Sequence, residues 1–110
     1  MGPSQTFELQ YYTAKNGKDY YRDFLDSLDD RTSAYVQAQV RKLAVGIGKV
    51  KTLDNKLWEL KVEIGPGYRV LFTRRGDEIV LILAGAHKRD QERTIALARR
   101  LLKEIEKEGK

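Results

Sequence analysis

Apolar and polar residues alternate in three consecutive runs between residues 57 and 91. The run 58–64 places Trp58, Leu60, Val62 and Ile64 between three charged residues. A period of two indicates a half-buried strand. The run 68–73 alternates in the same way, and 78–84 is almost wholly apolar, which favours a central strand covered on both faces. The glycine-containing connections are Gly65-Pro66-Gly67 and Arg75-Gly76-Asp77. The pattern predicts a three-stranded antiparallel meander.

The remaining stretches predict one strand and three helices. Residues 6–12 alternate loosely and are rich in aromatic side chains, which favours a first strand. Residues 19–28 and about 31–47 show helical spacing, so we expect an αα-hairpin. The apolar stripe of the second helix is Val36, Val40, Leu43 and Ile47. A final helix follows Asp90, a candidate N-cap, with an apolar face of Ile95, Ala98, Leu102 and Ile105. The predicted order is β-α-α-β-β-β-α, an α+β domain with its helices on one face of an antiparallel sheet.

Composition narrows the class of protein. The 110 residues suit one domain, 1–110, and we expect residues 1–5 to be disordered or a remnant of cloning. The hydrophobic content of 41% argues against disorder. There is no cysteine, no long apolar run and no signal-peptide pattern, so we expect a cytoplasmic protein that does not bind membranes. No cluster of histidine and carboxylate has metal-ligand spacing, and we expect neither a metal nor a cofactor.

The positive charge is unevenly distributed. The net charge is +5, and residues 49–75 alone carry +4 while residues 88–110 carry +3. A positive field over the meander and the final helix favours a polyanion, of which nucleic acid is the commonest. The alternative is a surface that serves only solubility.

Two sets of residues are candidates for chemistry on RNA. His87 is the only histidine and lies at the end of the last strand beside Lys88 and Arg89. Imidazole exchanges protons near neutral pH, as metal-independent cleavage through a 2′-hydroxyl requires. The alternative for His87 is an ordinary polar surface position.

Arg69 has two interpretations. If residues 65–67 form a three-residue loop, Glu63 faces Arg69 across the strands and forms an exposed ion pair worth at most about 1 kcal/mol. Otherwise Arg69 and Lys61, on the same non-core face, present donors to a phosphate. Either way Arg69 is expected to point outward, so that Arg69→Ala leaves the protein folded. Under the second interpretation this change also removes activity. Tyr68 is expected in the core, with a base-stacking role as the lesser alternative.

The sequence as a whole resembles a known superfamily. The resemblance is carried by Leu57-Trp58-Glu59-Leu60-Lys61, by the strand Gly67-Tyr68-Arg69-Val70-Leu71-Phe72, and by Gly85, Lys88 and Gln91. These stretches resemble the corresponding stretches of the RelE/ParE toxins. Within that superfamily they are most similar to the HigB-like, phage Gp49-related toxins of type II toxin–antitoxin systems. The likeness extends over residues 6–105. It implies a RelE-like fold, a ribosome-dependent mRNA endonuclease, and neutralisation by an antitoxin of the helix-turn-helix, HigA-like kind.

The resemblance also implies which residues act. The catalytic residues would be Arg69, His87 and Lys88, and Lys61 and Gln91 would contact the RNA. The number of basic side chains, rather than the resemblance, adds Lys56, Arg74, Arg75 and Arg89 to the RNA-binding residues, with a solvated surface as the alternative. Glu59 departs from the pattern, because some relatives have a lysine there. Two other functions stay open: a ParE-like toxin that inhibits gyrase without cutting RNA, and a catalytically silent, antitoxin-binding module of a repressor complex.

Overall fold

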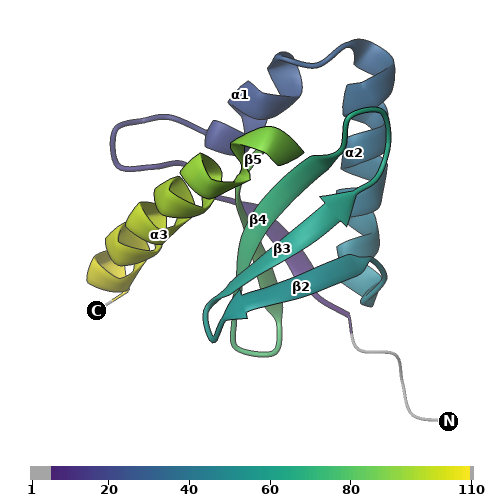
Figure 1. Ribbon diagram of the computed structural model, residues 1–110. Coiled ribbons are helices and arrows are strands. Elements are labelled where there is room, and N and C mark those ends of the chain that lie inside the picture. Colours follow the sequence, from purple (N-terminus) through teal and green to yellow (C-terminus); the bar gives the residue numbers. More distant parts are fainter. Residues whose placement is uncertain (1–5, 110) are drawn as a thin grey trace, which may run out of the picture.

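The predicted α+β architecture is confirmed by the computed structural model, which describes residues 6–109 (Figure 1). Its elements in chain order are β1 (Glu8–Tyr11), α1 (Tyr20–Asp26), α2 (Asp30–Lys42), a 3-10 helix (Leu43–Val45), β2 (Lys49–Asp54), β3 (Leu57–Val62), β4 (Tyr68–Arg75), β5 (Ile79–His87), a second 3-10 helix (Lys88–Asp90) and α3 (Gln91–Glu108). The expectation about residues 1–5 lies outside the described residues. None of the helices within 6–109 combines the length and the apolar character needed to cross a membrane.

The sheet contains five strands in the order β1-β5-β4-β3-β2. The antiparallel meander of β3, β4 and β5 is confirmed. β1 pairs with β5 in parallel, with Glu8 opposite Ile79, so the sheet is mixed rather than wholly antiparallel. Alternation along a strand is the same in both directions of pairing, and the sequence pattern therefore could not reveal this.

β2 is the strand that the sequence analysis missed. The second helix ends at Lys42 rather than near residue 47, and Gly46, with a φ of 77°, turns the chain after the 3-10 helix. Val36, Val40 and Leu43 are buried as predicted, but Ile47 is 56% exposed and does not belong to the stripe. The first four residues of β2 are exposed, which is why they carry no strong apolar alternation.

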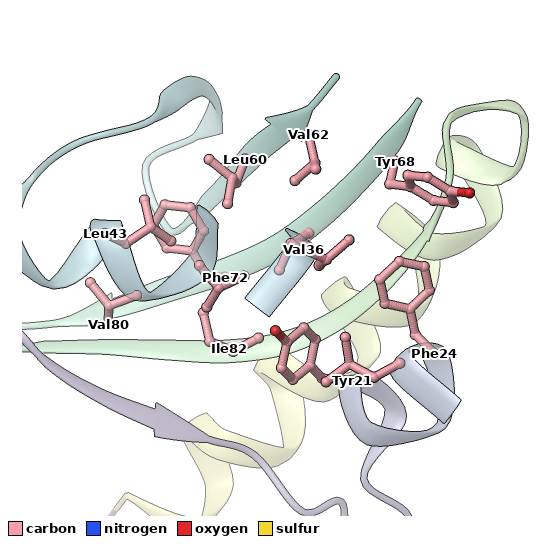
Figure 2. Close-up of a cluster of buried hydrophobic side chains, with 13 residues drawn as sticks. Tyr21, Phe24, Val36, Leu43, Leu60, Val62, Tyr68, Phe72, Val80 and Ile82 are labelled. Carbon is pink, nitrogen blue, oxygen red and sulfur yellow. The ribbon is translucent and has the colours of Figure 1, made fainter. Parts of the chain in front are cut away.

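Helices cover both faces of the sheet, which corrects the prediction of one covered face. On one face α1 and α2 pack against alternate strand residues, among them Val62, Phe72 and Ile82 (Figure 2). On the other face α3 packs against a second cluster, made by Leu57, Leu71, Leu81 and Leu83 with Ala98, Leu101 and Ile105. The apolar run of β5 contributes to both clusters, as a strand covered on both faces should.

Two details of α3 differ from prediction. Leu101 is buried where Leu102 was expected, and Leu102 and Ile95 pack only partly buried at the edge of the cluster. Asp90 does occupy the N-cap position, but its side chain makes no capping hydrogen bond. Instead the Thr94 hydroxyl donates to the Asp90 carbonyl at 3.0 Å.

Candidate functional site

The connection between β3 and β4 sets the register of the site. Val62 pairs with Tyr68 and Lys61 pairs with Arg69, so residues 63–67 all belong to the connection. The first interpretation of Arg69, with a three-residue loop and Glu63 opposite Arg69, is therefore wrong. Glu63 instead lies 3.6 Å from the Lys49 Nζ on the neighbouring strand. Positive φ angles at Gly65 and Gly67 allow the wider loop to close.

Arg69 is buried, which corrects the expectation that it points outward. Its side chain is 7% exposed, and that of Glu59, its partner, is 0% exposed, with 3.7 Å between Arg69 Nε and Glu59 Oε1. The Gln91 amide donates to Glu59 Oε2 at 2.7 Å. These residues form the Glu59–Arg69–Gln91 cluster. It is covered because α3, which begins at Gln91, packs against β4 on this face.

The Glu59–Arg69–Gln91 cluster contains a buried ion pair whose facing atoms are not hydrogen-bonded to each other. Arg69 Nη1 donates to the Tyr68 carbonyl at 3.0 Å, but Arg69 Nε and Glu59 Oε1 have no hydrogen-bond partner. Two charges withdrawn from water at this separation hold each other by Coulomb attraction without a direct hydrogen bond. Removal of one of them would leave the other buried and uncompensated.

Arg69 and Lys88 meet at a small surface hollow next to the loop. The hollow, called here the loop hollow, is lined by Glu63, Gly65, Pro66, Gly67, Arg69 and Lys88. The Lys88 N–H donates to the Gly67 carbonyl at 3.0 Å. A Cβ atom on Gly67 would lie 3.6 Å from Lys88 Cβ and 3.9 Å from Arg69 Nη1. The Lys88 stem and the Arg69 guanidinium thus both border Gly67, whose φ of 90° rather than lack of space favours glycine.

His87 lies on the other face of the sheet. It pairs with Tyr68, and the two rings pack with their centroids 4.9 Å apart. Tyr68 belongs to the cluster beneath α1 and α2, whereas Arg69 faces α3. Of the three predicted catalytic residues, Arg69 and Lys88 come together, and His87 is separated from Arg69 by the thickness of the sheet.

The predicted RNA-binding residues divide between the two ends of the strands. Lys61, Arg89 and Gln91 lie near the loop hollow, and Gln91 is engaged with Glu59. The second group is Lys56, Arg74 and Arg75. Arg74 and Arg75 end β4, roughly 20 Å along the strand from Arg69 at about 3.4 Å per residue.

The second group is held by contacts of its own. Lys56 Nζ lies 2.7 Å from Glu106 Oε2. The Arg74 guanidinium lies 4.8 Å from the centre of the Phe7 ring and 5.4 Å from that of Trp58. These contacts anchor the two residues at the far end of the sheet, so the predicted RNA-binding set does not form one patch.

Sequence reasoning missed the partnership of Glu59 with Arg69. The two are diagonal neighbours, since Glu59 pairs with Leu71 and Lys61 pairs with Arg69. Only the register of β3 against β4 reveals this, and no signal within either strand could. In residues 6–109 no group of three or more histidine, cysteine or carboxylate side chains could hold a metal ion.

A family model and one protein of known sequence are similar to this chain. The family model described as phage-derived protein Gp49-like (DUF891) matches residues 23–103, which contain every predicted site residue. A protein of Haemophilus influenzae, described only as uncharacterised, is 30% identical over 76 residues. That match spans 68% of this chain and 77% of the relative.

Proposed function

We propose a function from the premise that this chain belongs to the phage-derived Gp49-like family, a family of the RelE/ParE-like toxin superfamily. Membership makes it a candidate toxin with an antitoxin as its partner. In the proposal it is a HigB-like toxin that cleaves mRNA on translating ribosomes and is neutralised by a HigA-like antitoxin. The observation that carries the enzymatic part is the convergence of Arg69 and Lys88 on the loop hollow.

The proposed reaction uses the RNA itself as nucleophile. The 2′-oxygen attacks the adjacent phosphorus, its proton passes to a base, the bond to the 5′-oxygen breaks, and an acid protonates that leaving oxygen. Lys88, which is exposed, and Arg69 Nη1, at the edge of the hollow, would stabilise the negative charge on the phosphoryl oxygens. His87, the residue expected from the sequence to exchange the proton, lies on the opposite face of the sheet from Arg69, so it would act only on RNA that passes around the end of β5 beside Lys88.

Lys88→Ala is the sharpest test of this site, because Lys88 is exposed and its loss should leave the fold intact. We expect induced wild-type protein to arrest bacterial growth and to cut ribosome-bound mRNA in a primer-extension assay. Lys88→Ala should reduce cutting by roughly a hundredfold with an unchanged melting temperature.

The matched control is Lys103→Ala, the same change at an exposed position of α3. It should cut as the wild type does. Normal growth with soluble wild-type protein would refute the toxin function, and normal cutting by Lys88→Ala would remove Lys88 from the catalytic set.

A second candidate is a toxin that acts by binding, such as a gyrase inhibitor. The observation that favours it is Glu59, which neutralises Arg69 inside the fold. The carboxylate partly cancels the electrostatic field of the arginine, so a strand arginine paired in this way attracts a phosphate less strongly. Growth arrest without mRNA cleavage, together with inhibition of DNA supercoiling by purified gyrase, would select this alternative.

A further inference from the structure

β2 forms an outer edge of the sheet. Among the described residues it pairs only with β3, and it is the last strand in the sheet order (Figure 1). Residues 49–52 are exposed. An edge strand presents backbone N–H and C=O groups that another extended segment can pair with. β2 therefore exposes a six-residue strand for such pairing, whereas β1, at the opposite edge, has four residues.

One side of this edge is apolar. Val50 pairs with Leu60 and Thr52 with Trp58, so both face the side on which α2 lies. There they line a groove together with Phe7, Leu43, Phe72 and Val80. The groove is mainly apolar, and its one charged lining residue among those described is Arg74, whose guanidinium lies over the Phe7 and Trp58 rings. Next to the groove, Val45 is 49% exposed, Ile47 56% and Val50 44%. Exposed aliphatic side chains gathered beside an apolar groove are typical of an interaction surface.

The other side of the edge is basic. Lys49 and Lys51 alternate with Val50 and point to the face that carries Lys61, the register partner of Lys49. Both side chains are exposed. Lys49 lies 3.6 Å from Glu63, and Lys51 sits opposite Glu59, whose charge is already opposed by Arg69. The edge therefore joins an apolar side to a positively charged side.

We propose that β2 is the docking strand for an extended acidic segment of the partner protein, in which aliphatic and acidic residues alternate. Paired with β2, such a segment would place its aliphatic residues on the groove and its carboxylates beside Lys49 and Lys51. The identity of that partner as the antitoxin rests on the proposed function. A second copy of this chain is a poor occupant, because it would oppose lysines to lysines.

The first experiment uses a defined probe. A ten-residue peptide in which valine and glutamate alternate is titrated into the ¹⁵N-labelled protein, with a peptide of the same composition in two blocks as its control. We expect amide shifts confined to β2 and the groove, and weak or no binding of the block peptide. Absence of shifts, shifts elsewhere, or equal binding of both peptides would overturn the proposal.

Matched variants test each side of the edge. Lys49→Gln with Lys51→Gln should weaken peptide binding at least about tenfold. Lys103→Gln with Lys107→Gln, the same charge change at exposed positions of α3, should leave it unchanged. Ile47→Thr with Val50→Thr should also weaken binding, since these changes replace exposed apolar groups by hydroxyl groups. Equal affinity of all three double variants would contradict the proposal.

The second experiment separates this inference from the proposed function. The product of the adjacent gene is co-expressed, and growth is followed. We expect Ile47→Thr with Val50→Thr to arrest growth and to escape rescue, while the α3 double variant is rescued.

Full rescue of both double variants would overturn the docking strand and leave the toxin function intact. No arrest by the wild type would refute the toxin, and the peptide titration would still decide the docking strand. A dimer at micromolar concentration that the β2 changes abolish would assign the edge to a second copy instead.

Discussion

Burial changes what a single arginine does in this protein. Arg69→Ala would leave the fully buried Glu59 carboxylate without its cation. We expect a loss of about 3–5 kcal/mol in the free energy of unfolding, compared with about 1 kcal/mol or less for an exposed pair. Urea denaturation at pH 7 measures this. Replacement of both charges, Glu59→Gln with Arg69→Met, should restore much of the stability.

An unchanged unfolding midpoint for Arg69→Ala would show that the buried pair does not form in solution. The prediction also affects how activity is tested. If Arg69→Ala lowers stability this much, its loss of function cannot be assigned to chemistry, and Lys88→Ala is the variant that reports on the hollow.

The contact between α1 and β5 depends on one glycine. A Cβ atom at Gly85 would lie 2.4 Å from Phe24 Cδ2, so any side chain there would push α1 away from the sheet. We expect Gly85→Ala to destabilise the protein by about 1–3 kcal/mol, as overpacking of a core does.

Denaturant unfolding of Gly85→Ala in two backgrounds tests the cause. In the background Phe24→Leu, where the ring is absent, the additional cost of Gly85→Ala should shrink. If the losses in free energy of unfolding caused by the two changes simply add, Phe24 is not the reason that position 85 requires glycine.

At the scale of the whole molecule, carboxylates attach α3 to distant parts of the chain. Glu104 accepts from the Lys15 N–H and the Tyr12 hydroxyl, each at 3.0 Å, and these contacts hold its pKa below the ordinary 4.5. Lys56 lowers the pKa of Glu106 in the same way. The pKa of Asp54 is lowered from 3.8, first by the Lys56 N–H and then by Arg99.

These shifts predict how stability depends on pH. A carboxylate whose pKa is lowered by folding stabilises the protein above its unfolded pKa, and this contribution is lost as pH falls. The free energy of unfolding should therefore drop as pH falls below about 4.5. The pKa of Tyr12 is raised, mainly by burial and then by Glu104, so stability should also fall as pH rises above its ordinary 10.0. Urea titrations from pH 3 to 11 check both limits, and Glu106→Gln should make the acid limb shallower. A flat acid limb would contradict the prediction.

The overall charge predicts salt-dependent binding. The net charge of +5 is concentrated in residues 49–75 and 88–110, which include both groups of predicted RNA-binding residues. Affinity for ribosomes should fall as salt rises, because phosphate contacts release counterions. Sedimentation with ribosomes at several salt concentrations measures the slope, and a flat dependence would show that the basic residues act only as a solubilising surface.

The sequence by itself determined the elements whose periodicity is strong. The meander, the αα-hairpin and the final helix follow from spacings of two and of three to four residues, because such spacings record which side chains share a face. Composition and local motifs also sufficed for the α+β class and for the family. β2 escaped detection because an exposed edge strand has no buried face to impose a pattern.

Only the tertiary structure decided which faces meet solvent and which residues meet each other. The alternation around Arg69 is that of a strand with one polar face, yet α3 closes over that face and buries the arginine against Glu59. The register of β3 against β4 places Glu59 diagonally to Arg69, and the strand pleat sends His87 to the opposite face. These outcomes depend on contacts between residues far apart in the chain, and a local pattern contains no information about its distant neighbours.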